Sequence, residues 1–423
     1  MMLRAMVSDL FGRGEWALGP VMNPRIRVAY VVQSPVIGGL QRCVANLCNH
    51  LDRQWFWPMV ISLTKSGPAA QWIRRDDVPI IELHKPSGND LGVVFRLART
   101  LRRHRVDIVH SHNWGTLVET TLARRLARVA VHVHAERGTV LGDLEIRGVK
   151  RRVRAAAMGW ALRRADSVVS NALATARRIE ATCGYRAGRV RVIPNGVEEP
   201  AAADRHQTRR RVRRTLGVPA DAPVVGSVGR LVPVKAFHLA IEALAQLGAP
   251  QQHGAPPHLV LVGDGPEREA LRRRAVSLGL DDRVHLVGYR QDVGNWLAAM
   301  DVYVNTSLSE GMSQSIVEAM AFGLPLVVTD VGDSAVVVDG RAPCGVVVPP
   351  ADVEALGRAL QILLSDEPRR VALACNARSR YQACYAMPAM VAAYGKMYAE
   401  LVGHSANPER AFHQEAVVRG GTE

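Results

Sequence analysis

The stretch VYVNTSLSEGMSQSIVEAMAFGLPLVVT, Val302 to Thr329, has a short apolar run at each end and a helical pattern between them. Residues 302–305 and 326–329 predict buried strands, and residues 315–321 predict the helix that joins them. A strand, a helix and a second strand in this order form a βαβ unit, whose two strands run parallel. The stretch therefore predicts a parallel sheet with helices packed on it.

The same alternation extends along most of the chain. Further apolar runs predict strands at 27–33, 58–63, 80–83, 107–110, 130–134, 167–170, 190–193, 224–228, 258–262 and 284–287. The turn at 194–196 and the polar stretch 198–207 predict a linker between two series of such units. We therefore expect an α/β fold of two Rossmann-like, doubly wound parallel-sheet domains, 25–200 and 201–386, with an N-terminal extension, 1–24, and a flexible tail, 404–423.

The composition is typical of a globular protein with two domains. The chain has 423 residues, of which 48% are hydrophobic and 22% charged, and this excludes a disordered or fibrous protein. No stretch reaches the roughly 18 to 20 uncharged apolar residues of a membrane-spanning helix. The six cysteines form no C-x-x-C pair, which favours a reduced, cytoplasmic protein without structural zinc.

The net positive charge lies entirely in the first half of the chain. Residues 1–200 hold 31 Lys and Arg against 16 Asp and Glu, which accounts for the whole excess of 15. A one-sided positive charge favours an anionic partner for that half, such as a phosphate-bearing substrate, an acidic lipid surface or nucleic acid. The alternative is a set of solvated, arginine-rich faces.

Two carboxylates stand eight residues apart in the central stretch. Glu310 lies in the loop after the strand 302–305, and Glu318 lies inside the following helix. Residues 311–315 supply a helix N-terminus, where free N–H groups and the positive dipole end attract phosphate. Beside such a turn, Glu310 suits the hydroxyl groups of a sugar. The alternative is that Glu310 pairs with the helix dipole and Glu318 lies on a solvated face.

Two cations follow another predicted strand of the second half. Arg230 and Lys235 lie in the loop after the strand 224–228, where Arg can bind a diphosphate through forked hydrogen bonds and Lys as a point charge. The turn at Gly263 lacks the third glycine of G-x-G-x-x-G, so a nicotinamide or flavin cofactor is not predicted. Tyr289 lies in the next such loop, where a base could stack.

The first half carries a glycine turn and four histidines at the ends of predicted strands. Gly38 and Gly39 form the first strand-to-helix turn, where a phosphate or sugar can approach the backbone closely. The histidines form two H-x-H pairs, His110 with His112 and His132 with His134. Four imidazoles on neighbouring strands would suit a metal ion, and this is the chief rival interpretation.

The motifs together resemble a known family. In order, the chain carries Gly38-Gly39, HAERG at 134–138, VIPNGV at 192–197, VGRL at 228–231, Lys235, VGDGP at 262–266, VGYRQDV at 287–293 and the Glu-x₇-Glu segment followed by AMAFGLPLVVTD. This set resembles the retaining glycosyltransferases of family four, which have the GT-B fold, over residues 25 to about 400. It is most similar to sugar transferases of bacterial exopolysaccharide and cell-envelope biosynthesis.

The resemblance implies that the second domain binds a nucleotide diphosphate sugar, a UDP- or GDP-sugar, at an interdomain cleft. Glu318 would hold the ribose hydroxyls, Arg230 and Lys235 the diphosphate, and Glu310 the hydroxyls of the transferred sugar. From the first domain, His134 would lie near the sugar. The predicted catalytic residues are Glu310, Arg230, Lys235 and His134. The predicted donor-binding residues are Gly38, Gly39, Arg230, Lys235, Gly263, Tyr289, Gly311, Met312, Ser313, Gln314, Ser315 and Glu318.

The resemblance also implies that a C-terminal helix, 387–403, crosses back to the first domain. One position departs from the family pattern, because Ala236 stands where a glycine usually follows the lysine. The chain has no D-x-D pair, so we expect no metal cofactor, and the Arg, Lys and helix dipole would neutralise the diphosphate. With no second carboxylate placed as a nucleophile, we expect same-face attack with retention of configuration.

The acceptor is suggested by one basic segment. Residues 150–164, KRRVRAAAMGWALRR, place basic residues on both sides of an apolar centre. This pattern is typical of a helix on an anionic membrane, and it equally fits a helix packed on the first domain with a basic rim. On the first interpretation the acceptor is a glycan or a polyprenyl-linked oligosaccharide at the inner face of the cytoplasmic membrane.

Two other functions remain open at this point. A metal-dependent hydrolase would use the H-x-H pairs. A non-catalytic binding protein of GT-B shape would use the basic first half, although only 5% of residues are aromatic and no nucleic-acid module is recognisable, so we expect no nucleic-acid partner.

Overall fold

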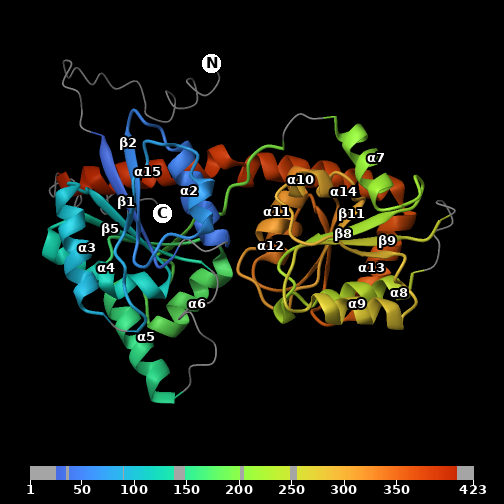
Figure 1. The fold of residues 1–423 in the computed structure, drawn as a ribbon, viewed down its shortest axis with the longest axis horizontal. Coiled ribbons are helices and arrows are strands. Elements are labelled where there is room, and N and C mark those ends of the chain that lie inside the picture. Colours follow the sequence, from blue (N-terminus) through green and yellow to red (C-terminus); the bar gives the residue numbers. More distant parts are fainter. Residues whose placement is uncertain are drawn as a thin grey trace, which may run out of the picture.

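The computed structural model describes residues 25–34, 38–88, 90–137, 148–200, 204–247 and 255–406, apart from the side chains of 404–406. The predicted extension 1–24, and the predicted tail beyond 406, lie outside these ranges. The chain forms two lobes, each a parallel sheet with helices on both faces (Figure 1). The predicted fold class, two doubly wound α/β domains, is confirmed.

The first lobe is built on a sheet of parallel strands in the order β3-β2-β1-β4-β5-β6-β7. These are β1 (Ile26–Val32), β2 (Phe56–Ser62), β3 (Ile80–Glu82), β4 (Ile108–His112), β5 (Val131–Glu136), β6 (Ser167–Ser170) and β7 (Val190–Val192). The helices between them are α2 (Gly39–His50), α3 (Gly92–Arg103), α4 (Trp114–Ala127), α5 (Gly148–Leu162) and α6 (Leu173–Cys183). Strand β1 is buried on both faces, with Tyr30 toward α2 and Val31 toward α3, as a parallel sheet requires.

The second lobe repeats this plan with the order β10-β9-β8-β11-β12-β13. Its strands are β8 (Val224–Val228), β9 (His258–Val262), β10 (Val284–Leu286), β11 (Val302–Asn305), β12 (Leu326–Thr329) and β13 (Gly345–Val348). Its helices are α7 (Arg205–Thr215), α8 (Phe237–Ala245), α9 (Arg268–Ser277), α10 (Val293–Leu297), α11 (Gln314–Ala321), α12 (Ser334–Val338), α13 (Val353–Ser365) and α14 (Glu367–Arg380). The direction of winding reverses between β8 and β11, the place where ligands bind in such sheets.

Helix α13 shows how local sequence and burial act together in this lobe. Asp352 caps its N-terminus by accepting a hydrogen bond from the N–H of Ala355 at 2.8 Å. Leu356, Leu360 and Leu363 follow at helical spacing and are buried in the core. Apart from the C-terminal helix 387–403 that the family resemblance implies, the predicted strands and helices end at residue 329 and do not include this helix.

Two segments cross between the lobes, and they are hydrogen-bonded to each other. The N–H of Val197 donates to the carbonyl of Tyr385 at 3.0 Å, and the carbonyl of Val197 accepts from the N–H of Met387 at 2.9 Å. The hydroxyl of Tyr381 donates to the same Val197 carbonyl at 3.0 Å. The two crossings therefore form one hinge.

The last helix, α15 (Met387–Ala406), runs from the second lobe across the first (Figure 1). Its buried side chains in the core of the first lobe are Met387, Met390, Tyr394, Met397 and Tyr398. The buried guanidinium of Arg137 donates hydrogen bonds to the hydroxyl of Tyr394 and to the side-chain oxygen of Asn195. The HAERG and VIPNGV segments therefore hold α15 in place.

Two predicted boundaries differ from the structure. The linker predicted at 198–207 ends earlier, because the carboxylate of Asp204 accepts hydrogen bonds from the N–H groups of His206 and Gln207 at 2.9 and 3.1 Å and starts α7 there. The last helix continues to Ala406, three residues beyond the predicted end. Both differences concern helix ends, and the first is set by the capping contact of Asp204.

Gly196 leaves no room for a side chain at the hinge. A Cβ atom there would lie 2.9 Å from both Met387 Cα and Met390 Cβ. We expect Gly196→Ala to lower the free energy of unfolding by about 1–3 kcal/mol, because the backbone of α15 must shift. Thermal or urea denaturation measures this difference.

Gly403→Ala is the matched control. Gly403 is exposed on α15, the helix that Gly196 contacts, and nothing lies within 4 Å of its Cβ position. This variant should be neutral or more stable by up to about 1 kcal/mol. Equal stabilities of Gly196→Ala and the wild type would contradict the close contact at the hinge.

Candidate functional site

The loops after β8 and β11 meet at the reversal of winding in the second lobe. Lys235, in the first loop, donates a hydrogen bond from Nζ to Oε1 of Glu310 in the second. The hydroxyl of Ser307 donates to the same oxygen at 2.8 Å. The structure therefore brings together two of the four predicted catalytic residues, which are separated by 75 positions.

The backbone of both loops is fixed by further hydrogen bonds. The N–H of Leu308 donates to the carbonyl of Val234 at 2.8 Å, and the hydroxyl of Thr306 donates to the carbonyl of Lys235 at 2.8 Å. From β12, the hydroxyl of Thr329 donates to the carbonyl of Ser307 at 2.7 Å. These contacts hold the Lys235–Glu310 pair without help from the first lobe.

Arg230 lies in the loop after β8, the same loop that carries Lys235. Its side chain is exposed and makes no hydrogen bond or ion pair within the described part of the chain. Gly229, next to it, packs on the lysine, since a Cβ there would lie 3.7 Å from Lys235 Cε. Arg230 therefore leaves its five N–H donors open.

Gly263, which follows β9, packs against the backbone of this loop at Gly229. Its φ of 145° lies outside the range of ordinary side chains, and a Cβ there would meet the carbonyl oxygen of Gly229 at 1.9 Å. The sequence predicted Gly263 as a donor-binding residue. The structure gives a packing reason for this glycine, and its contact with a donor stays a prediction.

Ala236, which stands where the family usually has a glycine, adopts a left-handed backbone conformation. Its φ of 45° and ψ of 42° lie in the left-handed region, which costs an alanine about 1–2 kcal/mol. Its methyl group is buried in the core of the lobe, which offsets part of that cost. The turn after Lys235 is therefore present without the glycine.

The N-terminus of α11 follows Glu310 directly. Ser313 occupies the capping position, but its hydroxyl caps no N–H of the helix. That hydroxyl lies 3.4 Å from Nδ2 of Asn305 and 3.2 Å from the hydroxyl of Ser315 instead. The first N–H groups of α11 thus have no side-chain cap and can bind an anion. The other predicted residues of this turn, Gly311, Met312 and Gln314, are half-buried or buried.

Glu318 lies one turn further along α11 and faces the first lobe. Burial raises the pKa of its carboxyl to about 7, and the positive charge of Arg42 on α2 opposes this shift. Gly38 and Gly39 begin that same helix, and the Cβ position of Gly39 is open. Tyr289 lies beyond β10 and is 55% exposed. Sequence reasoning missed Arg42, which no motif marks.

His134 is not brought together with the other predicted residues. It is fully buried in the first lobe, and its Nδ1 lies 2.8 Å from the hydroxyl of Ser111, which also bonds His132 at 2.8 Å. Its Nε2 lies 3.5 Å from the carboxylate of Glu136, whose pKa is raised by burial. Gly138, the last residue of HAERG, lies outside the described residues.

The two H-x-H pairs lie on opposite faces of the sheet. The register of β4 and β5 pairs Ser111 with His134, so His110 and His112 point the other way, where Nδ1 of His110 meets the Tyr398 hydroxyl at 2.7 Å. Across the described ranges no three His, Cys, Asp or Glu side chains come together as metal ligands. The interpretation of the four imidazoles as one metal site is wrong, because the sheet separates them.

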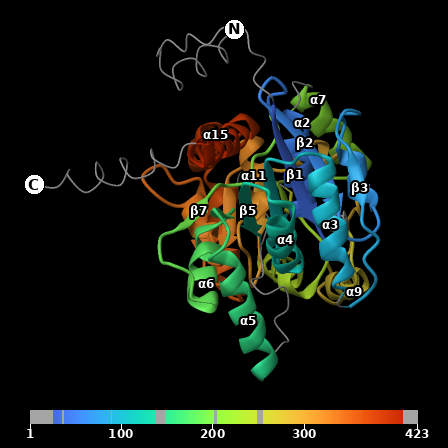
Figure 2. The same ribbon diagram turned by 90° about the vertical axis from the view of Figure 1, so that its left-hand side faces the viewer.

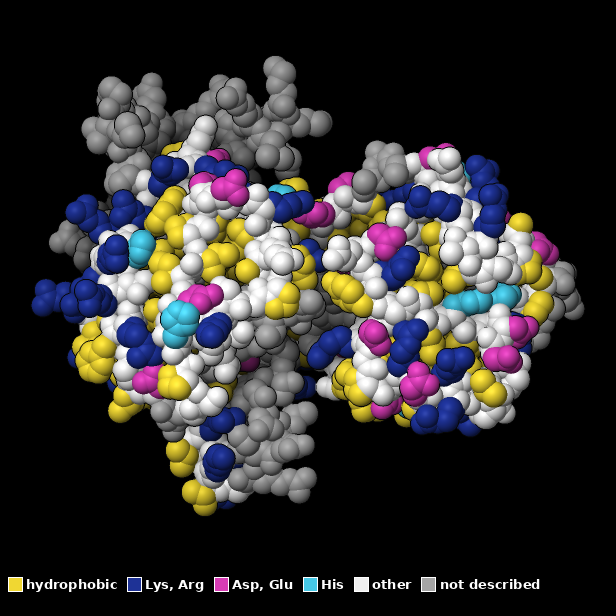
Figure 3. Space-filling view, in the orientation of Figure 1, with side chains coloured by type: hydrophobic (Ala, Val, Ile, Leu, Met, Phe, Trp, Pro, Cys, Tyr) yellow, Lys and Arg dark blue, Asp and Glu magenta, His cyan; other side chains and the backbone are white. Residues whose placement is uncertain are grey.

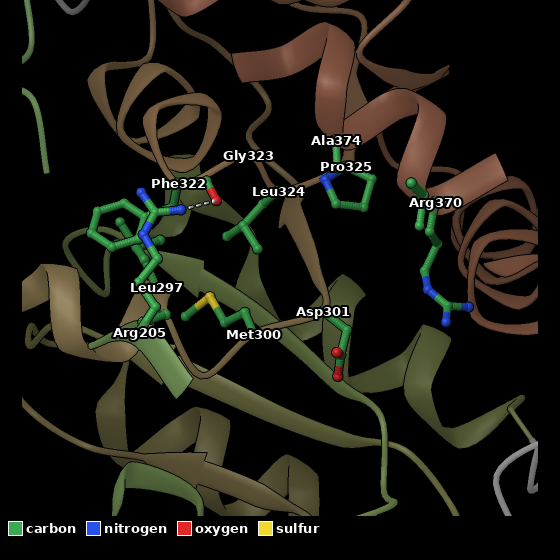
Figure 4. Close-up of a pocket in the computed structure, with 12 residues that line it drawn as sticks. Arg205, Leu297, Met300, Asp301, Phe322, Gly323, Leu324, Pro325, Arg370 and Ala374 are labelled. Carbon is green, nitrogen blue, oxygen red and sulfur yellow. Dashed lines mark hydrogen bonds between the residues drawn. The ribbon is translucent and has the colours of Figure 1, made fainter. Parts of the chain in front are cut away.

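A separate pocket of about 250 Å³ lies at the opposite edge of the second sheet (Figure 4). Asp301 and Pro325, which line it, directly precede β11 and β12. Glu310 and Lys235 follow the other ends of their strands. The pocket is therefore remote from the loops that carry the candidate site.

The two lobes face each other through the loop ends that carry these residues. The N–H groups of Leu173 and Ala174, after β6, donate to the carboxylate of Asp333, after β12. Figure 3 shows an indentation between the lobes. The predicted residues of the second lobe thus lie at the edge of the sheet that faces the first.

Comparison with known proteins gives matches over both lobes. Residues 37–199 match the family model "Glycosyltransferase Family 4", and residues 222–366 match "Glycosyl transferases group 1". The lipopolysaccharide core biosynthesis glycosyltransferase LpsE of Rhizobium meliloti is 34% identical over 56% of this chain and 65% of its own, just under two thirds of its length. The 2-deoxystreptamine N-acetyl-D-glucosaminyltransferase of Streptomyces fradiae is 31% identical over 83% of this chain and 88% of its own.

A solved structure shows the same fold. HepE of Anabaena, crystallised with UDP, is 24% identical and superposes with a TM-score of 0.76 over 89% of this chain and 100% of its own. The chain therefore shares the two-domain fold of HepE, as the sequence motifs led us to expect. With family models on both lobes and a relative matched over most of its length, the chain belongs to glycosyltransferase family 4 and is a glycosyltransferase.

Proposed function

We propose that the enzyme moves a sugar from a nucleotide diphosphate sugar to a glycan or lipid-linked acceptor of the cell envelope, with retention of configuration and without a metal. The observation that carries this proposal is the Lys235–Glu310 pair beside the uncapped N-terminus of α11. The cation and the free N–H groups can bind a phosphate, and the carboxylate beside them can accept hydrogen bonds from the hydroxyls of a sugar joined to it. The UDP bound by HepE supports a nucleotide ligand.

The donor would lie along the edge of the second sheet. The ribose hydroxyls would donate to Glu318, and the diphosphate would lie between Arg230, Lys235 and the first N–H groups of α11. The hydroxyls of the transferred sugar would donate to Glu310. The positive charge of Arg42, on α2 of the other lobe, opposes the rise in the pKa of Glu318, and it favours the ionised carboxylate that accepts such hydrogen bonds.

The reaction places charge where the fixed groups can stabilise it. As the bond between sugar and diphosphate breaks, the leaving oxygen becomes negative and the anomeric carbon becomes positive. Lys235 and Arg230 would stabilise the leaving oxygen, and the Glu310 carboxylate would lie next to the sugar. The oxygen of the acceptor hydroxyl then bonds to the anomeric carbon on the face that the diphosphate leaves, and its proton passes to the leaving phosphate oxygen, so configuration is retained.

The first lobe would hold the acceptor, and α5 would bring the enzyme to an anionic membrane surface at the inner face of the cytoplasmic membrane. Helix α5 points away from the sheet (Figure 2), and Val149 and Val153 at its outer end are 74% and 63% exposed. The basic residues 150–152 stand between these valines in the sequence and are exposed, and Figure 3 shows basic side chains at the tip of the lobe. Exposed valines among cations suit a lipid surface better than water. No described helix is long and apolar enough to cross a bilayer.

The cations and Glu310 should be required for transfer and not for folding. We expect Lys235→Ala, Arg230→Ala and Glu310→Ala each to lower kcat about 100-fold or more, because each removes charge stabilisation in a closed site. A panel of UDP- and GDP-sugars with a lipid-linked or glycan acceptor gives the rates. The anomeric proton signal of the product gives the configuration.

Arg358→Ala is the control, since Arg358 pairs with Glu354 on the exposed face of α13. It should transfer sugar at the wild-type rate. Near-normal turnover of the Lys235 and Arg230 variants, an inverted product, or loss of activity in EDTA would each contradict the proposed mechanism.

Glu318→Gln should stabilise the unliganded enzyme and weaken UDP binding. The carboxyl pKa of about 7 lies above its ordinary value of 4.5, so the folded state binds this proton more tightly. The contribution of Glu318 to the free energy of unfolding therefore falls as pH rises from about 4.5 to 7. Above pH 7 the carboxyl is ionised, and this contribution stays at its lowest value. At pH 8 we expect the variant to be about 1–3 kcal/mol more stable than the wild type.

Melting curves from pH 5 to 8 with and without UDP make this measurement. Glu354→Gln, at a carboxylate that is 78% exposed, should show no gain that grows with pH. A stability difference for Glu318→Gln that stays constant over this range would rule out the buried carboxyl as its cause.

The membrane proposal rests on the tip of α5. Arg151→Ser with Arg152→Ser should lower binding to phosphatidylglycerol vesicles about tenfold or more, since each basic residue near an anionic surface contributes about 1 kcal/mol. The control pair is Arg272→Ser with Arg273→Ser on α9 of the second lobe, which is likewise exposed. Equal co-sedimentation of all three proteins, or equal binding to neutral phosphatidylcholine vesicles, would remove the proposal.

A further inference from the structure

Asp333 makes an unusual contact between the lobes. It directly precedes α12 and occupies the position where an aspartate ordinarily caps its own helix. Its carboxylate caps nothing in α12. Instead it accepts hydrogen bonds from the N–H groups of Leu173 at 2.5 Å and Ala174 at 2.7 Å, at the start of α6 in the other lobe.

Helix α6 needs this carboxylate. The residue at its own capping position is Ala172, which has no polar side chain and makes no cap hydrogen bond. The first N–H groups of a helix carry the positive end of its dipole and lack partners within the helix. The second lobe therefore supplies the cap that the first lobe lacks.

The contact is shielded from water. Asp333 is 7% exposed, and Ala172 is fully buried within the hydrophobic core cluster of the second lobe. A charge-assisted hydrogen bond is strongest where water is excluded. Opening of the lobes would leave both the carboxylate and the α6 N–H groups to be solvated again.

The same residue is tied to the loop of Glu310. The N–H of Asp333 donates to the carbonyl of Gly311 at 2.9 Å. Gly332, with a φ of 58°, lies so close that a Cβ would meet the carbonyl oxygens of Gly311 and Glu310 at 2.4 and 2.5 Å. The backbone at 332–333 thus holds the Glu310 loop, while the side chain at 333 holds the first lobe.

We infer that Asp333 is a positioning residue that couples closure of the two lobes to the geometry of the Glu310 loop. It touches neither donor nor acceptor in the proposed scheme. Its effect on turnover rests on the proposed function, whereas its effect on closure does not. Loss of the contact should therefore change the shape of the free protein as well as its rate.

Three variants test the contact from both sides. Asp333→Ala removes the acceptor, and Asp333→Asn keeps the shape and one oxygen. Leu173→Pro removes one donor, and proline is well tolerated at this first helical position because its fixed φ suits the helix. Ala172 before it is extended, with φ −141° and ψ 142°, as a residue before proline prefers. The control is Asp352→Ala, which removes a cap inside one lobe.

Small-angle X-ray scattering of each unliganded protein, UDP binding and steady-state transfer make the measurements. We expect Asp333→Ala and Leu173→Pro to have a larger radius of gyration than the wild type. Their kcat should fall about tenfold or more, whereas the UDP Kd should change less than about twofold. The double variant should be no worse than Asp333→Ala, since both act on one contact. Asp333→Asn should be intermediate.

Asp352→Ala should lose stability but keep the wild-type scattering and kcat. Wild-type scattering and turnover in a folded Asp333→Ala protein would overturn the inference. If the wild type transferred no sugar at all, the proposed function would fail, and scattering alone would then decide whether Asp333 closes the lobes.

Discussion

All strands of both sheets run parallel, so every connection must return along the outside of the sheet before the next strand begins. This constraint gathers one set of loops at each edge. In the second lobe the winding reverses between β8 and β11, and two loops far apart in sequence become neighbours there. The ion pair of Lys235 and Glu310 follows from that strand order, and its fixed backbone makes a site of stable shape.

Much of this arrangement could be predicted from the sequence. The run 302–329 indicated a parallel unit, and the strand ends located Arg230, Lys235 and Glu310 because side chains after parallel strands share one edge. The spacing of two within each H-x-H pair also places both of its histidines on one face of the strand. It did not show which way each pair faces, because that depends on the register between strands.

Other features could not be predicted, because they depend on how the lobes are placed. Arg42 faces Glu318, and Asp333 meets the start of α6, only once both sheets turn their loop edges toward each other. Arg137 and Asn195 stand in motifs typical of the family. Arg137 donates hydrogen bonds to Asn195 and to Tyr394 of the last helix, so packing of that helix explains both residues. A family motif located these residues without indicating their physical role.

Helix α15 completes the core of a lobe whose other elements all precede residue 200. During synthesis the ribosome therefore releases the whole second lobe before the first lobe can cover its sheet. Until then the apolar face around Tyr30 is covered by α2 but not by α15. The exposed apolar face can bind other molecules non-specifically while the second lobe is being made. The first lobe can complete its folding only after the second lobe has been synthesised.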